Sequence, residues 1–131
     1  MVSFISHLTI DAHHPYALSR WWSGVLDFHE DPDDPNLPEH DECMIVSPDG
    51  GTRLLFIAVP DEKSVKNRLH LDLRPTEGTR DEELQRLLAA GAQVFDDLRR
   101  PDGLGWVVLT DPEGNEFCIL RSAAEIGAPR G

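Results

Sequence analysis

The sequence predicts an α+β protein built from two copies of one strand-helix-strands unit. Two segments alternate between aliphatic side chains on one face and histidine with polar side chains on the other, as a half-buried strand requires. These segments are residues 6–11 and 67–74. A helical stretch follows each of them, so the order of elements is the same in both halves.

The spacing within the two halves supports the repeat. Each half contains a proline-glycine turn that opens a further apolar strand, at residues 47–52 and 111–116. His7 precedes Gly50 by 43 residues, and His70 precedes Gly114 by 44 residues. We therefore interpret His7 and His70 as equivalent positions of an internal repeat.

The first half is predicted to contain a strand, a helix and a hairpin. Residues 2–11 form the strand, and Pro15 takes the permissive first position of the helix. Apolar residues at three-and-four spacing give this helix a face for a sheet; they are Ala17, Leu18, Trp21, Trp22, Val25 and Leu26. Residues 30–42 form an acidic, proline-containing surface loop, and residues 43–46 and 53–59 pair as a hairpin.

The second half repeats this order with clearer boundaries. After the strand at residues 68–74, Thr79 and Glu82 form a capping box that starts a helix. Leu84, Leu87 and Leu88 are its buried stripe, and Gly91 ends it in a left-handed conformation. Three strands follow, at residues 93–98, 105–110 and 117–120.

Charge and composition exclude several classes of partner. The 131-residue chain carries 24 acidic and 12 basic side chains, a formal net charge of -12, so nucleic acid and anionic membranes are repelled. No apolar run is long enough to span a bilayer. Cys43 and Cys118 are the two cysteines, expected to be free thiols in a reduced, cytoplasmic compartment.

The chain resembles the glyoxalase/bleomycin-resistance group, the vicinal oxygen chelate superfamily, and is most similar to its small bacterial glyoxalase-like domains. The resemblance is carried by residues 7–11, 25–28, 70–73, 87–92 and 106–118. It implies two βαβββ modules that form a concave mixed sheet, with one helix per module outside and a cleft for a small molecule. The single domain then divides into module one at residues 1–62, module two at 67–125 and a tail at 126–131.

Two departures from the family pattern carry consequences. Asp27 stands at the end of the first helix, where the family usually has glycine, so it is expected to adopt a conformation that favours glycine. The four positions that supply metal ligands in relatives map onto His7, Leu54, His70 and Cys118. The usual glutamate ligand is therefore replaced by Cys118.

The resemblance leaves two readings of these positions open. His7, His70 and Cys118 form a donor set that suits a divalent metal, zinc above all, with one open coordination position. In relatives such a metal acts as a Lewis acid on two neighbouring substrate oxygens. In the other reading, which we favour for these residues, both histidines line the cleft without a metal and Cys118 is a small buried hydrophobe.

The function expected from the resemblance is that of a glyoxalase-like lyase or isomerase acting on a small oxygenated metabolite. Glu116 and Asp72 are the candidate catalytic bases. Thr9, Leu54 and Trp22 are the candidate cleft-lining residues, although a core role is favoured for Trp22. The alternative is a metal-free protein of the bleomycin-resistance type that binds or sequesters an antibiotic or metabolite. A regulatory or interaction module is the third hypothesis, and a homodimer is expected by resemblance.

Overall fold

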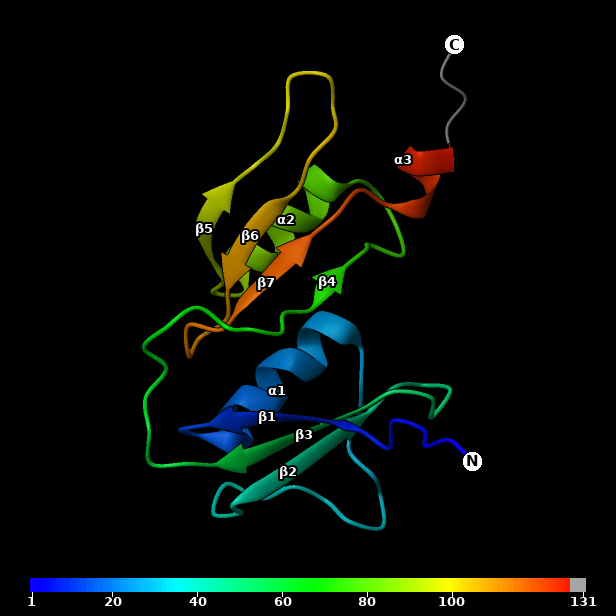
Figure 1. The fold of residues 1–131 in the computed structure, drawn as a ribbon. Coiled ribbons are helices and arrows are strands. Elements are labelled where there is room, and N and C mark those ends of the chain that lie inside the picture. The colour runs from blue at the N-terminus through cyan, green and yellow to red at the C-terminus, as the bar shows by residue number, and fades with distance from the viewer. Residues whose placement is uncertain (128–131) are drawn as a thin grey trace. The chain divides into compact units, whose positions relative to one another are not determined.

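The computed structural model describes residues 1–127 and has the predicted α+β fold, with two βαβββ-like modules (Figure 1). The chain divides into two compact units, unit 1 at Met1–Glu62 and unit 2 at Lys63–Gly131. One mixed sheet has three strands and the other has four. Among the described residues, no helix is long and apolar enough to cross a bilayer.

Unit 1 contains β1 (Leu8–Ala12), α1 (Pro15–Leu26), β2 (Glu42–Val46) and β3 (Arg53–Ala58). β3 lies between the other two strands, parallel to β1 and antiparallel to β2. An isolated bridge from His29 to Val46 adds a fourth edge segment beside β2. The strand predicted at residues 2–11 is shorter than expected, because pairing with β3 begins only at Leu8.

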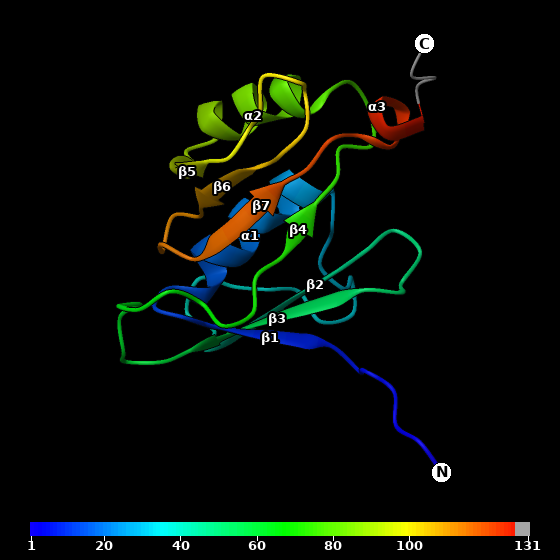
Figure 2. The ribbon, with the colours of Figure 1, turned by 45° about the horizontal axis from the view of Figure 1, so that its top comes forward.

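The core of unit 1 lies between α1 and one face of its sheet, an arrangement visible in Figure 2. The helix contributes Leu18, Trp22 and Val25 to this core. The strands contribute Ala12, Cys43, Ile45, Leu54 and Phe56, which are all buried. Trp22 is only 2% exposed, so its indole ring is part of the core.

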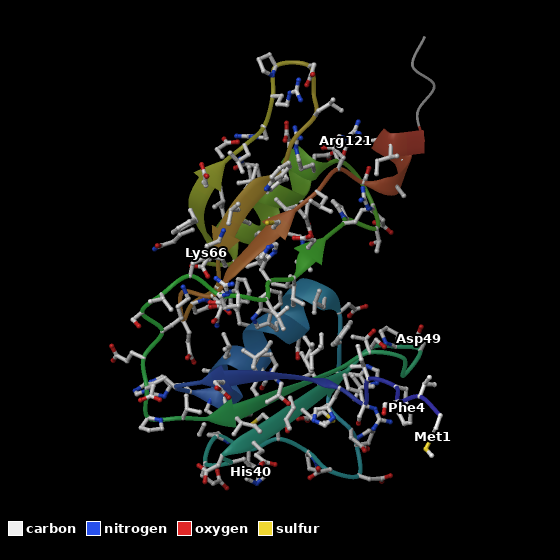
Figure 3. All side chains as sticks on the ribbon, viewed as in Figure 1. Met1, Phe4, His40, Asp49, Lys66 and Arg121 are labelled. Atoms are coloured by element: carbon white, nitrogen blue, oxygen red, sulfur yellow. The ribbon has the colours of Figure 1, made fainter. Side chains whose placement is uncertain are left out.

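The turn between β2 and β3 is organised around Asp49, which is labelled in Figure 3. The Ser47 hydroxyl and the Gly51 N–H both donate to Asp49 Oδ1, at 2.7 and 2.8 Å. These hydrogen bonds lower the pKa of Asp49, so the carboxylate stays charged and holds the turn closed.

Asp27 ends α1 in the left-handed region, with φ 55° and ψ 40°, as the sequence predicted. A side chain is strained there, and a negative charge at a helix C-terminus opposes the helix dipole. We therefore expect Asp27→Gly to raise the free energy of unfolding by about 0.5–1 kcal/mol in urea denaturation. Asp27→Asn is the matched control, because it removes the charge and keeps the side chain. A glycine variant no more stable than the asparagine variant would contradict the strain argument.

Unit 2 contains β4 (Asp72–Leu73), α2 (Arg80–Ala89), β5 (Gln93–Asp97), β6 (Val107–Thr110), β7 (Glu116–Ile119) and the short helix α3 (Ala123–Gly127). The strand order is β4-β7-β6-β5, with β4 parallel to β7 and the other pairs antiparallel. The strand predicted at residues 68–74 is reduced to Asp72–Leu73. Of the predicted tail, residues 126 and 127 belong to α3, and residues 128–131 lie outside the described residues.

Helix α2 begins and ends as the sequence predicted. The Glu82 N–H donates to Thr79 Oγ1 at 3.1 Å, and the Thr79 N–H donates to Glu82 Oε1 at 3.2 Å, which completes the capping box. Gly91 follows the helix with φ 108°. The buried face of α2 packs on one face of the sheet, which contributes Val107, Leu109, Phe117 and Ile119 to the core. The alternate residues of these strands point to the opposite face.

Candidate functional site

The face of the unit 2 sheet opposite α2 carries one row of side chains across all four strands. Asp72 of β4 pairs with Cys118 of β7, Cys118 pairs with Val108 of β6, and Val108 pairs with Asp96 of β5. Residues paired across neighbouring strands point to the same face of a sheet. The strand pairing therefore brings chemically reactive side chains from distant parts of the chain onto one surface.

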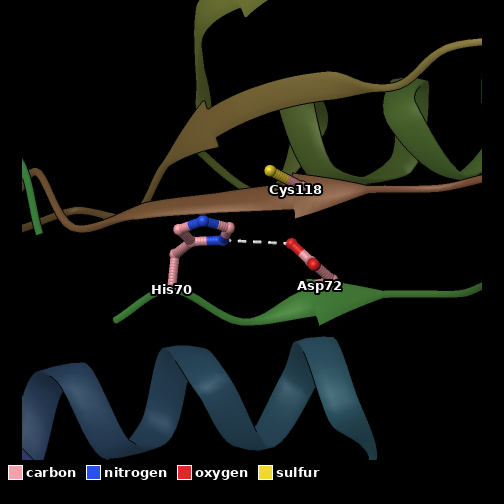
Figure 4. A group of neighbouring side chains, drawn as sticks. All are labelled: His70, Asp72 and Cys118. Atoms are coloured by element: carbon pink, nitrogen blue, oxygen red, sulfur yellow. Dashed lines mark hydrogen bonds and ion pairs between the residues drawn. The ribbon is translucent and has the colours of Figure 1, made fainter. Parts of the chain in front are cut away.

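His70, Asp72 and Cys118 form the cluster at the β4 end of this row, shown in Figure 4. One ligand atom from each residue lies within 4.8 Å of the others. His70 Nδ1 is 3.1 Å from Asp72 Oδ1. Because an ionised carboxylate only accepts hydrogen bonds, His70 Nδ1 is the donor in this contact, and in the neutral imidazole Nε2 is then the nitrogen with the lone pair. The His70 and Asp72 side chains are 40% and 50% exposed, so a ligand can reach them.

The Cys118 thiol is protonated at neutral pH. Burial raises its pKa to about 11, helped by its hydrogen bond to Asp72 and by the charge of that carboxylate, while the Lys66 charge acts in the opposite direction. A nucleophilic role requires the thiolate, so the environment of Cys118 disfavours nucleophilic catalysis. A divalent cation would bind the thiolate by displacing the thiol proton.

The donor chemistry of the cluster fits a divalent metal ion. It offers an imidazole nitrogen, a carboxylate oxygen and a sulfur, all of which are ligand types that zinc accepts. The hydrogen bond between Asp72 and His70 resembles the carboxylate–histidine pairing that orients metal-bound imidazoles. The residues present are thus sufficient to supply three donors.

The cluster lies on the wall of a cavity of about 360 Å³ within unit 2. Phe95, Trp106 and Val108 form an apolar part of its lining, and Lys66 and Asp96 add one charge of each sign. A cavity of this size suits a small molecule, with apolar walls to hold its body and polar groups to orient it.

Glu116 also borders the cavity, but both of its carboxylate oxygens already have partners. Lys63 Nζ donates to Oε1 at 2.5 Å, and the Asn67 N–H donates to Oε2 at 3.0 Å. Burial alone would raise the pKa of Glu116, yet the hydrogen bonds from Lys63 and Asn67 outweigh it and hold the pKa below its usual value. A carboxylate with a lowered pKa is a weak base, so Asp72 is the better placed of the two predicted bases.

We expect Glu116→Gln to lower the free energy of unfolding by about 2 kcal/mol at pH 7, because the buried end of the Lys63 ion pair loses its charge. A carboxyl with a lowered pKa contributes stability above its unfolded pKa and loses it as pH falls through the folded pKa. The difference between the two proteins should therefore begin to shrink as the pH falls below the unfolded pKa of about 4.3, and it should be lost only when the pH also lies below the lowered folded pKa. Urea denaturation across this range checks the result, with the exposed Glu77→Gln as control. A difference that persists unchanged at low pH would contradict it.

The residues predicted from the first half lie in unit 1. His7 and Thr9 are exposed, and His7 Nδ1 lies 3.0 Å from the Ser6 hydroxyl. Leu54 and Trp22 are instead buried between α1 and the sheet. On the opposite face, Thr9 is paired with Leu55.

Leu54 was predicted to be the equivalent of Cys118, but the strand pairing shifts this equivalence by one residue. The cause is a difference in turn length between the two units. In unit 1 the turn closes with a hydrogen bond from the Ser47 N–H to the Thr52 carbonyl, five residues later. In unit 2 the corresponding bond runs from Asp111 to Asn115, four residues later. Thr9 pairs with Leu55 as Asp72 pairs with Cys118, so Leu55 is the structural equivalent of Cys118.

Asp72 was predicted as a base from the sequence, but not as a third donor beside His70 and Cys118. The alternation of residues 70–73 already placed His70 and Asp72 on one strand face, which is the signal that could have found the pair. Phe95, Asp96 and Trp106 were missed as cavity residues. Their position depends on the register of β5 and β6, which one sequence does not reveal.

The chain belongs to the family of glyoxalase-like domains, whose model matches residues 7–120. A search of curated proteins found no match.

Solved structures share the fold at low sequence identity. The fosfomycin resistance protein FosX from Mesorhizobium loti has a TM-score of 0.67 and 17% identity, with 98% of this chain and 100% of that chain covered. A mutant FosX from Listeria monocytogenes, solved with Mn(II) and 1S,2S-dihydroxypropylphosphonic acid, has a TM-score of 0.68 and 16% identity over 95% of this chain and 94% of that chain. A glyoxalase/bleomycin resistance protein/dioxygenase family enzyme from Burkholderia phytofirmans has a TM-score of 0.64 and 21% identity, with coverages of 87% and 94%.

Proposed function

We propose that this protein is a metal-dependent glyoxalase-like enzyme, a lyase or isomerase that acts on a small oxygenated metabolite. The observation that carries the proposal is the convergence of His70, Asp72 and Cys118 on the wall of one cavity. The fold adds support, since it is shared with a FosX structure solved with Mn(II). Zinc is the metal that the sulfur and nitrogen donors favour.

Such a metal would supply Lewis acidity to two neighbouring oxygens of the substrate. The chain's own residues have separate tasks. Asp72 orients the His70 ring through Nδ1 and keeps a second carboxylate oxygen that can accept a proton from the substrate. Trp106 and Phe95 hold the apolar body of the substrate and exclude water from that side of the cavity. His7 stays a predicted ligand, tested separately by the His7→Ala variant.

Elemental analysis tests this proposal on protein purified without a metal-affinity tag. The protein is exposed to zinc, manganese, nickel or iron and then desalted. One equivalent of metal per chain, removed by a chelator, is the expected result. No retained metal after exposure to any of the four would overturn the proposal.

A specific observation also favours a second candidate function, that of a metal-free small-molecule binding protein. His70 and Cys118 both donate hydrogen bonds to Asp72, so the cluster is internally satisfied without an ion. A thermal-shift screen of small molecules with and without chelator separates the two functions. Stabilisation that survives the chelator supports the binding protein, and stabilisation that the chelator abolishes supports the enzyme.

We also propose a homodimer, since the resemblance implies one. Light scattering during gel filtration of the untagged chain measures its mass directly. Twice the chain mass of 14.7 kDa is expected, and the single-chain mass at all concentrations would contradict it.

A further inference from the structure

Strand β5 contains a β-bulge that turns two consecutive side chains toward the cavity of unit 2. Val94 pairs with Leu109 and Asp96 pairs with Val108, so two steps along β5 oppose one step along β6. Phe95 is the extra residue, and both Phe95 and Asp96 line the cavity. In a regular strand these two side chains would point to opposite faces. Bulges commonly re-aim side chains beside functional sites.

Asp96 stands at the far end of the row that begins with the metal-ligand cluster. Two strand spacings separate it from Cys118, which corresponds to about 10 Å between their backbones. Within residues 1–127, no hydrogen bond or ion pair engages the Asp96 carboxylate. Lys66 lines the same cavity, and its charge acts on Cys118. The two charges therefore give the cavity a cationic group near the cluster and an anionic group at the other end.

The lining between these ends is apolar and accessible. Val108 lies in the row between Cys118 and Asp96. Trp106 and Phe95 also line the cavity and are 42% and 57% exposed. Exposed aromatic rings that share a cavity offer flat surfaces on which another ring can stack. The space between the charged ends thus suits a flat, aromatic body.

We propose that Asp96 is a specificity-determining residue that binds a protonated amine at the distal end of an aromatic ligand. The opposite end of this ligand carries two neighbouring oxygens that bind the metal. This metal-binding end rests on the proposed function. A charge-assisted hydrogen bond from an ammonium group gives the Asp96 carboxylate the partner that it otherwise lacks. The net charge of -12 favours the approach of a cationic ligand over an anionic one.

A structural role for Asp96 makes a different prediction. Charged side chains on edge strands protect against pairing with other chains, and β5 is the edge of its sheet. In that case the removal of the Asp96 charge changes solubility or association, and ligand selectivity stays the same.

The test compares three benzohydroxamic acids that share the same chelating oxygens and differ in the para substituent. The substituents are aminomethyl, methyl and carboxylate, and affinities for the zinc-loaded protein are measured by calorimetry. The aminomethyl compound should bind about tenfold more tightly than the methyl compound. This preference should disappear in Asp96→Asn and persist in the control Glu77→Gln, an exposed residue that does not line the cavity.

A second arm tests the Asp96 end without metal. It compares 4-methylbenzylamine with 4-methylbenzyl alcohol on chelator-treated protein. If no hydroxamate binds in the first arm, the proposed metal site is wrong. If the second arm still shows a preference for the amine that depends on Asp96, the specificity role of Asp96 is supported. Equal preferences in the native protein and in Asp96→Asn would overturn the specificity role while leaving the metal site intact. Preference for the carboxylate compound, or no binding in either arm, would also overturn it.

Discussion

Replacing Gly105 with alanine is expected to lower the free energy of unfolding by about 3–5 kcal/mol. A Cβ at this position would lie 2.1 Å from the Leu98 carbonyl oxygen, and φ is +90°. The obstacle is backbone, which cannot rotate away as a side chain does. The Gly105 carbonyl also accepts a hydrogen bond from the buried Arg80 guanidinium at 3.0 Å, so the segment has little freedom to shift. Chemical denaturation monitored by circular dichroism measures the loss.

Gly103→Ala is the matched control for this prediction. Gly103 has a similar φ of +87°, but within residues 1–127 no atom outside Gly103 and its two chain neighbours lies within 4 Å of the position of a Cβ. Its alanine variant should therefore lose only about 1–2 kcal/mol, the cost of a left-handed backbone. Equal losses in the two variants would show that the close approach to Leu98 has no energetic effect. The larger loss matters for the site, because Gly105 directly precedes the cavity residue Trp106.

Replacing His70 with alanine is expected to weaken zinc binding by at least about 100-fold, because it removes one of three clustered donors. Asp72→Asn should weaken it by about 10- to 100-fold, since the neutral amide is a weaker metal donor than the carboxylate and also orients the His70 ring less firmly. Titration calorimetry in a weakly chelating buffer measures both affinities.

His29→Ala is the control for general effects of histidine removal, because His29 is exposed and lies in unit 1 outside the cluster. It should bind zinc as tightly as the native protein. If His70→Ala keeps full affinity, the cluster is not the zinc site. If His29→Ala loses as much affinity as His70→Ala, zinc binds nonspecifically to surface histidines.

Much of the fold could be predicted because local chemistry decides it. The capping box at Thr79 and Glu82 and the left-handed end of α1 at Asp27 depend on residues adjacent in the chain. The internal repeat placed the strands and helices in order. Strand lengths were less accessible, since β4 is limited to two residues by its pairing with β7.

The candidate site was predictable only in part, because its geometry depends on strand register. His70 and Cys118 were named from the repeat and the resemblance, and the structure places them beside Asp72. Leu54 was misplaced because one extra residue in the turn at residues 47–52 shifts the register of β3. The bulge that turns Phe95 and Asp96 toward the cavity arises from the pairing of β5 with β6, which has no local sequence signature.

The absorption spectrum after addition of cobalt(II) tests most directly whether the protein has a metal site built from His70, Asp72 and Cys118. Cobalt(II) replaces zinc in such sites, and a bound thiolate produces a charge-transfer band in the near ultraviolet. We expect this band to appear with one equivalent of cobalt, to disappear in Cys118→Ser and to remain in Cys43→Ser, whose thiol is buried in unit 1. A native protein without the band, or a band lost equally in both cysteine variants, would contradict the proposed site.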